Sequence, residues 1–137
     1  MALVSLLVYT VGVKCRGLNK KEEYAPEHIF SLSENTANKL LKQGMTDLIK
    51  HNRTHLVRTY PKGTRIASGN LDPLKFWRAG SHFAALNWQE FDSGMQLNEA
   101  MFAGTPGWVL KPHALLGGQK RERRVKLSLH IVGLSSR

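Results

Sequence analysis

Residues 55–98 constrain the fold of this 137-residue chain more than any other part of the sequence. Apolar and polar residues alternate over residues 55–60, which predicts a strand. A loop rich in proline, glycine and serine follows, and then Asp72-Pro73 supplies the N-cap and first-turn proline of a short helix that Gly80 ends. The apolar run at residues 83–88 predicts a second strand. A strand, a helix and a second strand make one βαβ unit, so the sequence predicts a parallel sheet.

The rest of the chain predicts further strands and helices. Residues 6–10 and 27–32 are expected to form two further strands, which brings the number of predicted barrel strands to four. Ser33 is a suitable N-cap for a helix with one apolar face, which Gly44 is expected to end or break. Another short helix is predicted over residues 95–102.

The charge of the chain indicates anionic partners. Twenty Lys and Arg residues against ten Asp and Glu residues give a formal net charge of +10. Nucleic acid, an anionic membrane surface and a phosphorylated small molecule all fit that sign. Little interleaving of aromatic and basic residues argues against a nucleic-acid partner. The single Cys15 excludes a disulfide framework, and residues 1–10 have neither the pattern of a secretory signal nor the length of a membrane span.

Five blocks of sequence, taken in order, carry a family resemblance. They are V-R-T-Y-P-K-G-T-R-I at 57–66, S-G-N-L-D-P-L-K-F-W at 68–77, A-L-N-W-Q at 85–89, G-M-Q-L-N-E-A-M-F at 94–102 and W-V-L-K-P at 108–112. Together they resemble the Y half of the catalytic barrel of eukaryotic phosphoinositide-specific phospholipase C. The segment L-V-Y-T-V-G-V-K at 7–14 also looks like the opening strand of that half.

This resemblance implies an α/β fold: the C-terminal half of a TIM-like (β/α)8 barrel, followed by one strand of a β-sandwich (C2) domain. Residues 1–112 are then the Y half of the phospholipase C catalytic barrel, and the glycine-containing, basic residues 113–124 are a linker. Apolar and polar residues alternate after residue 125, so residues 125–137 are interpreted as the first strand of a truncated C2 domain. A complete barrel needs eight strands, and the chain is therefore expected to be a fragment that lacks the X half.

Three residues match the headgroup-binding positions of the family. The resemblance places Ser31 at the end of the second strand, as a hydroxyl donor to a ring phosphate. It places Arg58 at the end of the third, where a planar guanidinium suits bidentate phosphate binding. Tyr60 shares a face with Arg58, because alternate residues of a strand point the same way, and it offers a flat surface to an inositol ring. On spacing alone, Arg58 would be a surface ion-pair residue and Tyr60 a rim aromatic.

The resemblance assigns the chemistry to the missing half. In the family, two histidines act as acid and base, and Ca2+ held by Asn, Asp and Glu side chains polarises the phosphodiester. All of these groups belong to the X half, so we expect no catalytic residue and no metal ligand in this chain, and no turnover by the chain alone. His55 and His82 are expected to be hydrogen-bonded structural histidines. Asn87 and Gln89 are either amides that support the site or structural amides.

The implied function is that of a part of a phosphoinositide phospholipase C. Such an enzyme hydrolyses phosphatidylinositol bisphosphate to diacylglycerol and inositol trisphosphate in intracellular signalling, in the cytoplasm and at the inner membrane face. The expected partners are the phosphoinositide headgroup, an anionic membrane surface and the X half, with no nucleic acid. The alternative is a non-catalytic half-barrel module that binds lipid headgroups or has a regulatory role. Ala67, Gly69 and Thr64 depart from common residues of the family, but none of them is a headgroup-binding position.

Overall fold

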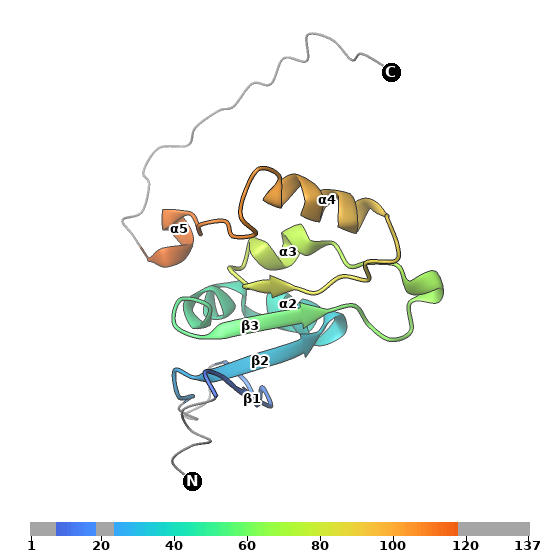
Figure 1. Ribbon diagram of the computed structural model, residues 1–137. Coiled ribbons are helices and arrows are strands. Elements are labelled where there is room, and N and C mark those ends of the chain that lie inside the picture. Colours follow the sequence, from blue (N-terminus) through green and yellow to red (C-terminus); the bar gives the residue numbers. More distant parts are fainter. Residues whose placement is uncertain (1–7, 19–23, 118–137) are drawn as a thin grey trace.

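The computed structural model describes residues 8–18 and 24–117. Within them, four strands form one sheet in the order β1-β2-β3-β4, and every neighbouring pair is parallel. The strands are β1 (Val11–Val13), β2 (His28–Ser33), β3 (Leu56–Tyr60) and β4 (Phe83–Ala84). Figure 1 shows them side by side, with their carboxyl ends at one edge of the sheet. The predicted parallel sheet is confirmed.

The two outer strands differ from their predicted bounds. The first strand was expected at residues 6–10, but residues 8–10 are not in a strand and residues 6 and 7 lie outside the described residues. The ladder to β2 begins at the pair Val11↔His28, and this pairing, not apolar composition, decides where β1 starts. β4 keeps only the first two residues of the predicted 83–88, because its ladder to β3 ends at Thr59↔Ala84.

Helix α2 (Glu34–His51) covers one face of the sheet, behind the strands in Figure 1. It begins as predicted: the Ser33 hydroxyl accepts a hydrogen bond from the Thr36 backbone N–H at 3.4 Å. Gly44 leaves helical geometry, with φ −176° and ψ 72°, so the predicted interruption is confirmed. The chain resumes a helical path beyond it and continues to His51, which is longer than the sequence pattern indicated.

Beyond β3, the described residues form a 3₁₀-helix, η1 (Ile66–Ser68), and three shorter α-helices. The α-helices are α3 (Pro73–Trp77), α4 (Ser93–Phe102) and α5 (His113–Leu116). The Asp72 carboxylate caps α3 by accepting from the Leu74 N–H at 3.1 Å, as predicted. Helix α4 begins two residues before the predicted start, because Asp92 caps it by accepting from the Met95 N–H at 3.1 Å. Helix α5 lies in the part of the chain predicted to be a linker, and the Arg53 side chain donates to the Leu115 carbonyl at 3.2 Å.

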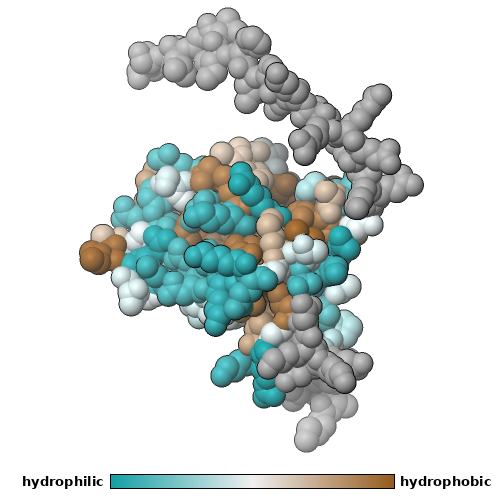
Figure 2. All heavy atoms as spheres, turned by 180° about the vertical axis from the view of Figure 1, so that it is seen from behind, coloured by the Kyte–Doolittle hydropathy of each residue, from teal (hydrophilic) through white to brown (hydrophobic). Residues whose placement is uncertain are grey.

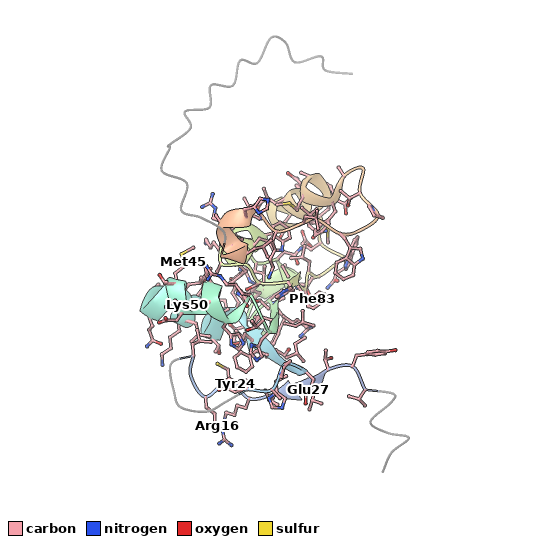
Figure 3. The ribbon with its side chains drawn as sticks, turned by 90° about the vertical axis from the view of Figure 1, so that its left-hand side faces the viewer. Arg16, Tyr24, Glu27, Met45, Lys50 and Phe83 are labelled. Atoms are coloured by element: carbon pink, nitrogen blue, oxygen red, sulfur yellow. The ribbon has the colours of Figure 1, made fainter. Side chains whose placement is uncertain are left out.

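The sheet has a covered face and an open face. The side chains that alternate inward from β2 and β3 are buried with residues of α2 and α3, and the core cluster is Phe30, Leu32, Ala37, Val57, Leu71 and Phe76. Cys15 is half-buried against this cluster, where burial raises the pKa of its thiol. The outer surface on the side of α2 is largely hydrophilic (Figure 2). In Figure 3, Phe83 lies on the opposite side of the sheet from Met45 and Lys50 of α2.

No helix within the described residues is long and apolar enough to cross a membrane.

Candidate functional site

Ser31 and Arg58 meet on the open face of the sheet. They are register partners in the parallel β2–β3 ladder, and each lies between two buried residues of its own strand. Because side chains alternate along a strand, both side chains point away from the core and are exposed. Arg58 Nη1 donates a hydrogen bond to Ser31 Oγ at 2.9 Å. This bond leaves the Ser31 hydroxyl proton and the other guanidinium N–H groups available to a ligand.

An aromatic residue flanks Arg58 on either side. The guanidinium carbon lies 5.1 Å from the centroid of the Tyr60 ring, within the range of a cation–π contact. On the neighbouring strand, Phe83 is the register partner of Arg58, and this residue is 37% exposed. A fixed cation with a hydroxyl and aromatic surface beside it is suited to an anionic ligand that also carries a ring.

The structure therefore brings the three predicted residues Ser31, Arg58 and Tyr60 together. It corrects their position along the strands, however. Ser31 is the fourth of six residues in β2 and Arg58 the third of five in β3, so both lie at mid-strand and only Tyr60 ends its strand. β2 ends at Ser33, one residue beyond its predicted end, because Ser33 pairs with Tyr60 in the ladder. β3 ends at Tyr60 as predicted, and Arg58 lies two residues before that end.

One carboxylate holds the turn that follows Tyr60. Glu34, the first residue of α2, accepts from Arg65 Nε at 2.8 Å and from Arg65 Nη2 at 2.5 Å. It also accepts from the backbone N–H of Lys62 at 3.3 Å. The hydrogen bonds from Arg65 hold the pKa of the Glu34 carboxyl below its usual value, and Glu34 raises the pKa of Arg65 in return. Sequence reasoning missed this pair, because 30 residues separate its members and no motif joins them.

A second network anchors the next part of the same loop. The buried Asn70 side chain accepts from the Asn87 backbone N–H at 2.6 Å and donates to the Glu90 carbonyl at 3.0 Å. The Asn70 backbone N–H donates to Asp92 at 2.6 Å, and this bond is the main reason that the Asp92 pKa is lowered. Asn87 Nδ2 donates to the Ser68 carbonyl at 2.7 Å. Of the two readings left open for Asn87, these bonds support the structural amide.

The histidines near the sheet lie at its amino edge, away from Tyr60. His55 Nε2 is 3.0 Å from the Tyr24 carbonyl oxygen, and His82 Nδ1 accepts from the Val57 N–H at 3.3 Å. The predicted hydrogen-bonded role of both is confirmed, although each immediately precedes a strand rather than lying in it. Burial, followed by the charge of Lys111, lowers the pKa of His82 to about 4. Lys111 Nζ is 2.7 Å from His82 Nε2.

Among the described residues, no group of three or more His, Cys, Asp or Glu side chains could hold a metal ion. Arg58 is an exposed cation on the open face of the sheet, with Ser31 and Tyr60 beside it. This arrangement can bind and orient an anion.

The fold and the site define the chain as half of a parallel (β/α)8 barrel with a candidate anion site on its inner face. Residues 3–114 match the family model described as phosphatidylinositol-specific phospholipase C, Y domain. The chain belongs to this family. The match contains the candidate site and nearly all of the described residues.

Similar proteins agree with this assignment. A relative from Candida albicans, 1-phosphatidylinositol 4,5-bisphosphate phosphodiesterase 1, is 44% identical over 117 residues, covering 82% of this chain and 11% of the relative. The protein of that name from Saccharomyces cerevisiae is 40% identical over 116 residues, covering 77% of this chain and 13% of the relative. The chain thus spans only about a tenth of the length of these relatives.

Solved structures give the same result for the fold. The crystal structure of PLC21 from S. officinalis matches with a TM-score of 0.76 and 33% identity, covering 82% of this chain and 15% of that chain. The crystal structure of PLC21 from L. pealei matches with a TM-score of 0.74 and 33% identity, covering 79% and 14% respectively. These matches confirm the half-barrel. The domain boundaries stay predictions, and the predicted C2 strand at 125–137 lies outside the described residues.

Proposed function

We propose that this chain supplies the headgroup-binding half of a phosphoinositide phospholipase C. In this proposal, Arg58 binds a phosphate on the inositol ring, Ser31 donates its hydroxyl to the same group, and Tyr60 packs against the ring. The observation that carries the proposal is the contact set on the open face, where Arg58 donates to Ser31 at 2.9 Å and lies over the Tyr60 ring at 5.1 Å. The names of the relatives support it, since those proteins are 1-phosphatidylinositol 4,5-bisphosphate phosphodiesterases.

The chemical groups of the reaction come from a complementary half-barrel, the X half. That half supplies the histidine acid and base and the ligands of Ca2+, which polarises the phosphodiester when it is bound. This chain contributes binding and orientation of the headgroup. The open face, and the outer strands β1 and β4 of the described sheet, provide the surface on which the complementary half would close the barrel.

The assembled enzyme acts at an anionic membrane surface, at the inner face of the cell membrane. Its products are diacylglycerol, which stays in the bilayer, and inositol trisphosphate, which leaves it. The net charge of +10 supports attraction to such a surface.

The test is a complementation assay. The 137-residue chain is co-expressed with the complementary half-barrel of the Candida albicans relative, and hydrolysis of phosphatidylinositol bisphosphate and of plain phosphatidylinositol is measured in vesicles with and without Ca2+. We expect Ca2+-dependent turnover by the pair and none by the chain alone. Headgroup binding without turnover, in a pair shown to be folded, would favour the non-catalytic module instead.

Substitutions in the pair test the residues. Arg58→Ala removes a charge-assisted contact worth roughly 1.5–3 kcal/mol, on the order of a tenfold to hundredfold loss, and the loss should be largest for the bisphosphate. Tyr60→Ala should weaken both lipids evenly, and Ser31→Ala should follow Arg58→Ala more mildly. The control is Lys39→Ala, which removes an exposed charge on α2, on the other side of the sheet. An equal loss for both lipids with Arg58→Ala would refute the phosphate-binding role.

A further inference from the structure

The turn after Tyr60 depends on a single carboxylate for its hydrogen bonds to α2. The Glu34 carboxylate accepts hydrogen bonds from Nε and Nη2 of Arg65 and from the backbone N–H of Lys62. The Glu34 side chain is only 12% exposed and the Arg65 side chain 27%, so the pair is partly buried. Charge-assisted bidentate pairs of this kind fix orientation as well as distance.

The position of the pair links it to the candidate site. Ser33 and Tyr60 are the last partners in the β2–β3 ladder. Glu34 follows Ser33 directly, and Lys62 lies two residues beyond Tyr60. The contacts of Glu34 therefore join the residues that follow β2 and β3, just beyond the last pair of the ladder. Strand ends without such contacts tend to fray.

The backbone beyond this turn also needs anchoring. Ala67 and Ser68 both have positive φ, 55° and 53°, a conformation that L residues rarely adopt. Ser68 is held on its far side by Asn87, and the turn before it is held by Glu34. The residues that Glu34 holds, Lys62 and Arg65, lie between this strained backbone and Tyr60.

We propose that Glu34 is a positioning residue for the headgroup site: through Arg65 and Lys62 it fixes the turn after Tyr60 and so keeps the Tyr60 ring beside Arg58. The inference rests on the proposed function, because it concerns the same site. Glu34 itself does not touch the ligand. Its carboxylate is already occupied by donors from the turn.

The test measures binding of inositol trisphosphate by titration calorimetry to the chain paired with the complementary half-barrel, at a temperature where each variant is shown to be folded. Glu34→Ala should weaken binding on the order of tenfold, because the ring contact of Tyr60 is lost while Arg58 and Ser31 still bind the ligand. Arg65→Lys should lose nearly as much, because lysine keeps the charge but lacks the planar fork. Glu34→Gln should lose less, since it still accepts from Lys62. The control is Lys50→Gln, which breaks an exposed pair at the far end of the same helix.

A double-mutant cycle separates positioning from general stability. In a Tyr60→Ala background, Glu34→Ala should have little further effect on affinity, because the residue that it positions is gone. Equal losses with and without the Tyr60 side chain, or unchanged affinity in Glu34→Ala, would overturn the proposal. Arg58→Ala is measured in parallel. If it binds normally, the proposed function fails; if it binds weakly while Glu34→Ala binds normally, only the positioning role fails.

Discussion

His51 should make the stability of the fold depend on pH in the acid range. Its ring stacks on Phe30 on one side and on His55 on the other, at 4.5 Å between centroids in both cases. Its Nε2 is buried and has no hydrogen-bond partner. Burial, followed by the charges of His55 and His82, lowers the pKa of His51 from 6.5 to about 4. The native state therefore holds this ring neutral.

The direction of this pH dependence follows from how many protons the native and unfolded chains bind. Below pH 6.5 the unfolded chain binds a proton at His51 that the native chain resists until about pH 4. The stabilisation is thus fully present above the unfolded pKa and is lost as the pH falls through this window. A shift of this size contributes at most about 2 kcal/mol between pH 7.5 and pH 5. Because His51 is only half-buried, solvent screening reduces the figure, and we expect about 1 kcal/mol.

The assay is urea unfolding of the paired half-barrels at pH 7.5 and at pH 5, followed by circular dichroism. His51→Phe keeps a stacking ring but cannot bind a proton, so the free-energy difference between the two pH values should shrink by about 1 kcal/mol. His113→Gln, at an exposed histidine in α5, serves as the control and should leave the difference unchanged. The same pH dependence in the wild type and in His51→Phe would refute the assignment to this ring.

Three further predictions concern packing and association. A Cβ at Gly94 would lie 2.5 Å from the Leu71 carbonyl oxygen, so Gly94→Ala should destabilise the fold by about 1–3 kcal/mol. The control Gly63→Ala, where a Cβ would have no atom within 4 Å, should change the stability little, and equal melting temperatures of the two variants would contradict this prediction. Asn70→Leu removes the partner of the Asn87 N–H and should cost at least about 2 kcal/mol in urea unfolding, and a neutral result would show that water replaces the amide. The chain without its complementary half should self-associate or melt without a sharp transition, because its sheet has open edges; a monodisperse monomer with a cooperative melt in light scattering and calorimetry would disprove this.

Local sequence patterns predicted the helices of this fold because residues close together in the chain determine where a helix begins or breaks. Asp72-Pro73 marks the start of α3, Ser33 marks the start of α2, and Gly44 marks the break within it. The candidate site was predicted for a similar reason. Arg58 and Tyr60 share a face of one strand whatever the register, so their alignment with a family motif was enough to place them together.

Strand ends and tertiary anchors could not be predicted in this way. The extent of β1 and β4 depends on which residues find a partner in the next strand, and the apolar character of the surrounding residues does not contain that information. The contact of Glu34 with Arg65 and the network of Asn70 with Asp92 join residues far apart in sequence. These contacts can be predicted only once the register of the sheet is known, because the register determines which loops are neighbours.

The open face explains why the proposed ligand and the proposed partner belong together. Arg58 is exposed at mid-sheet, and on the proposed function the complementary half-barrel covers this face and takes the guanidinium out of bulk water. A desolvated cation is costly unless an anion is paired with it, and the hydrogen bond to the neutral Ser31 hydroxyl does not balance its charge. A ring phosphate between the two halves would balance it. We therefore expect inositol trisphosphate to raise the melting temperature of the paired half-barrels, and to do so much less in Arg58→Ala, whose closed face no longer holds an unpaired cation. An equal rise in both proteins would show that the ligand stabilises the pair elsewhere.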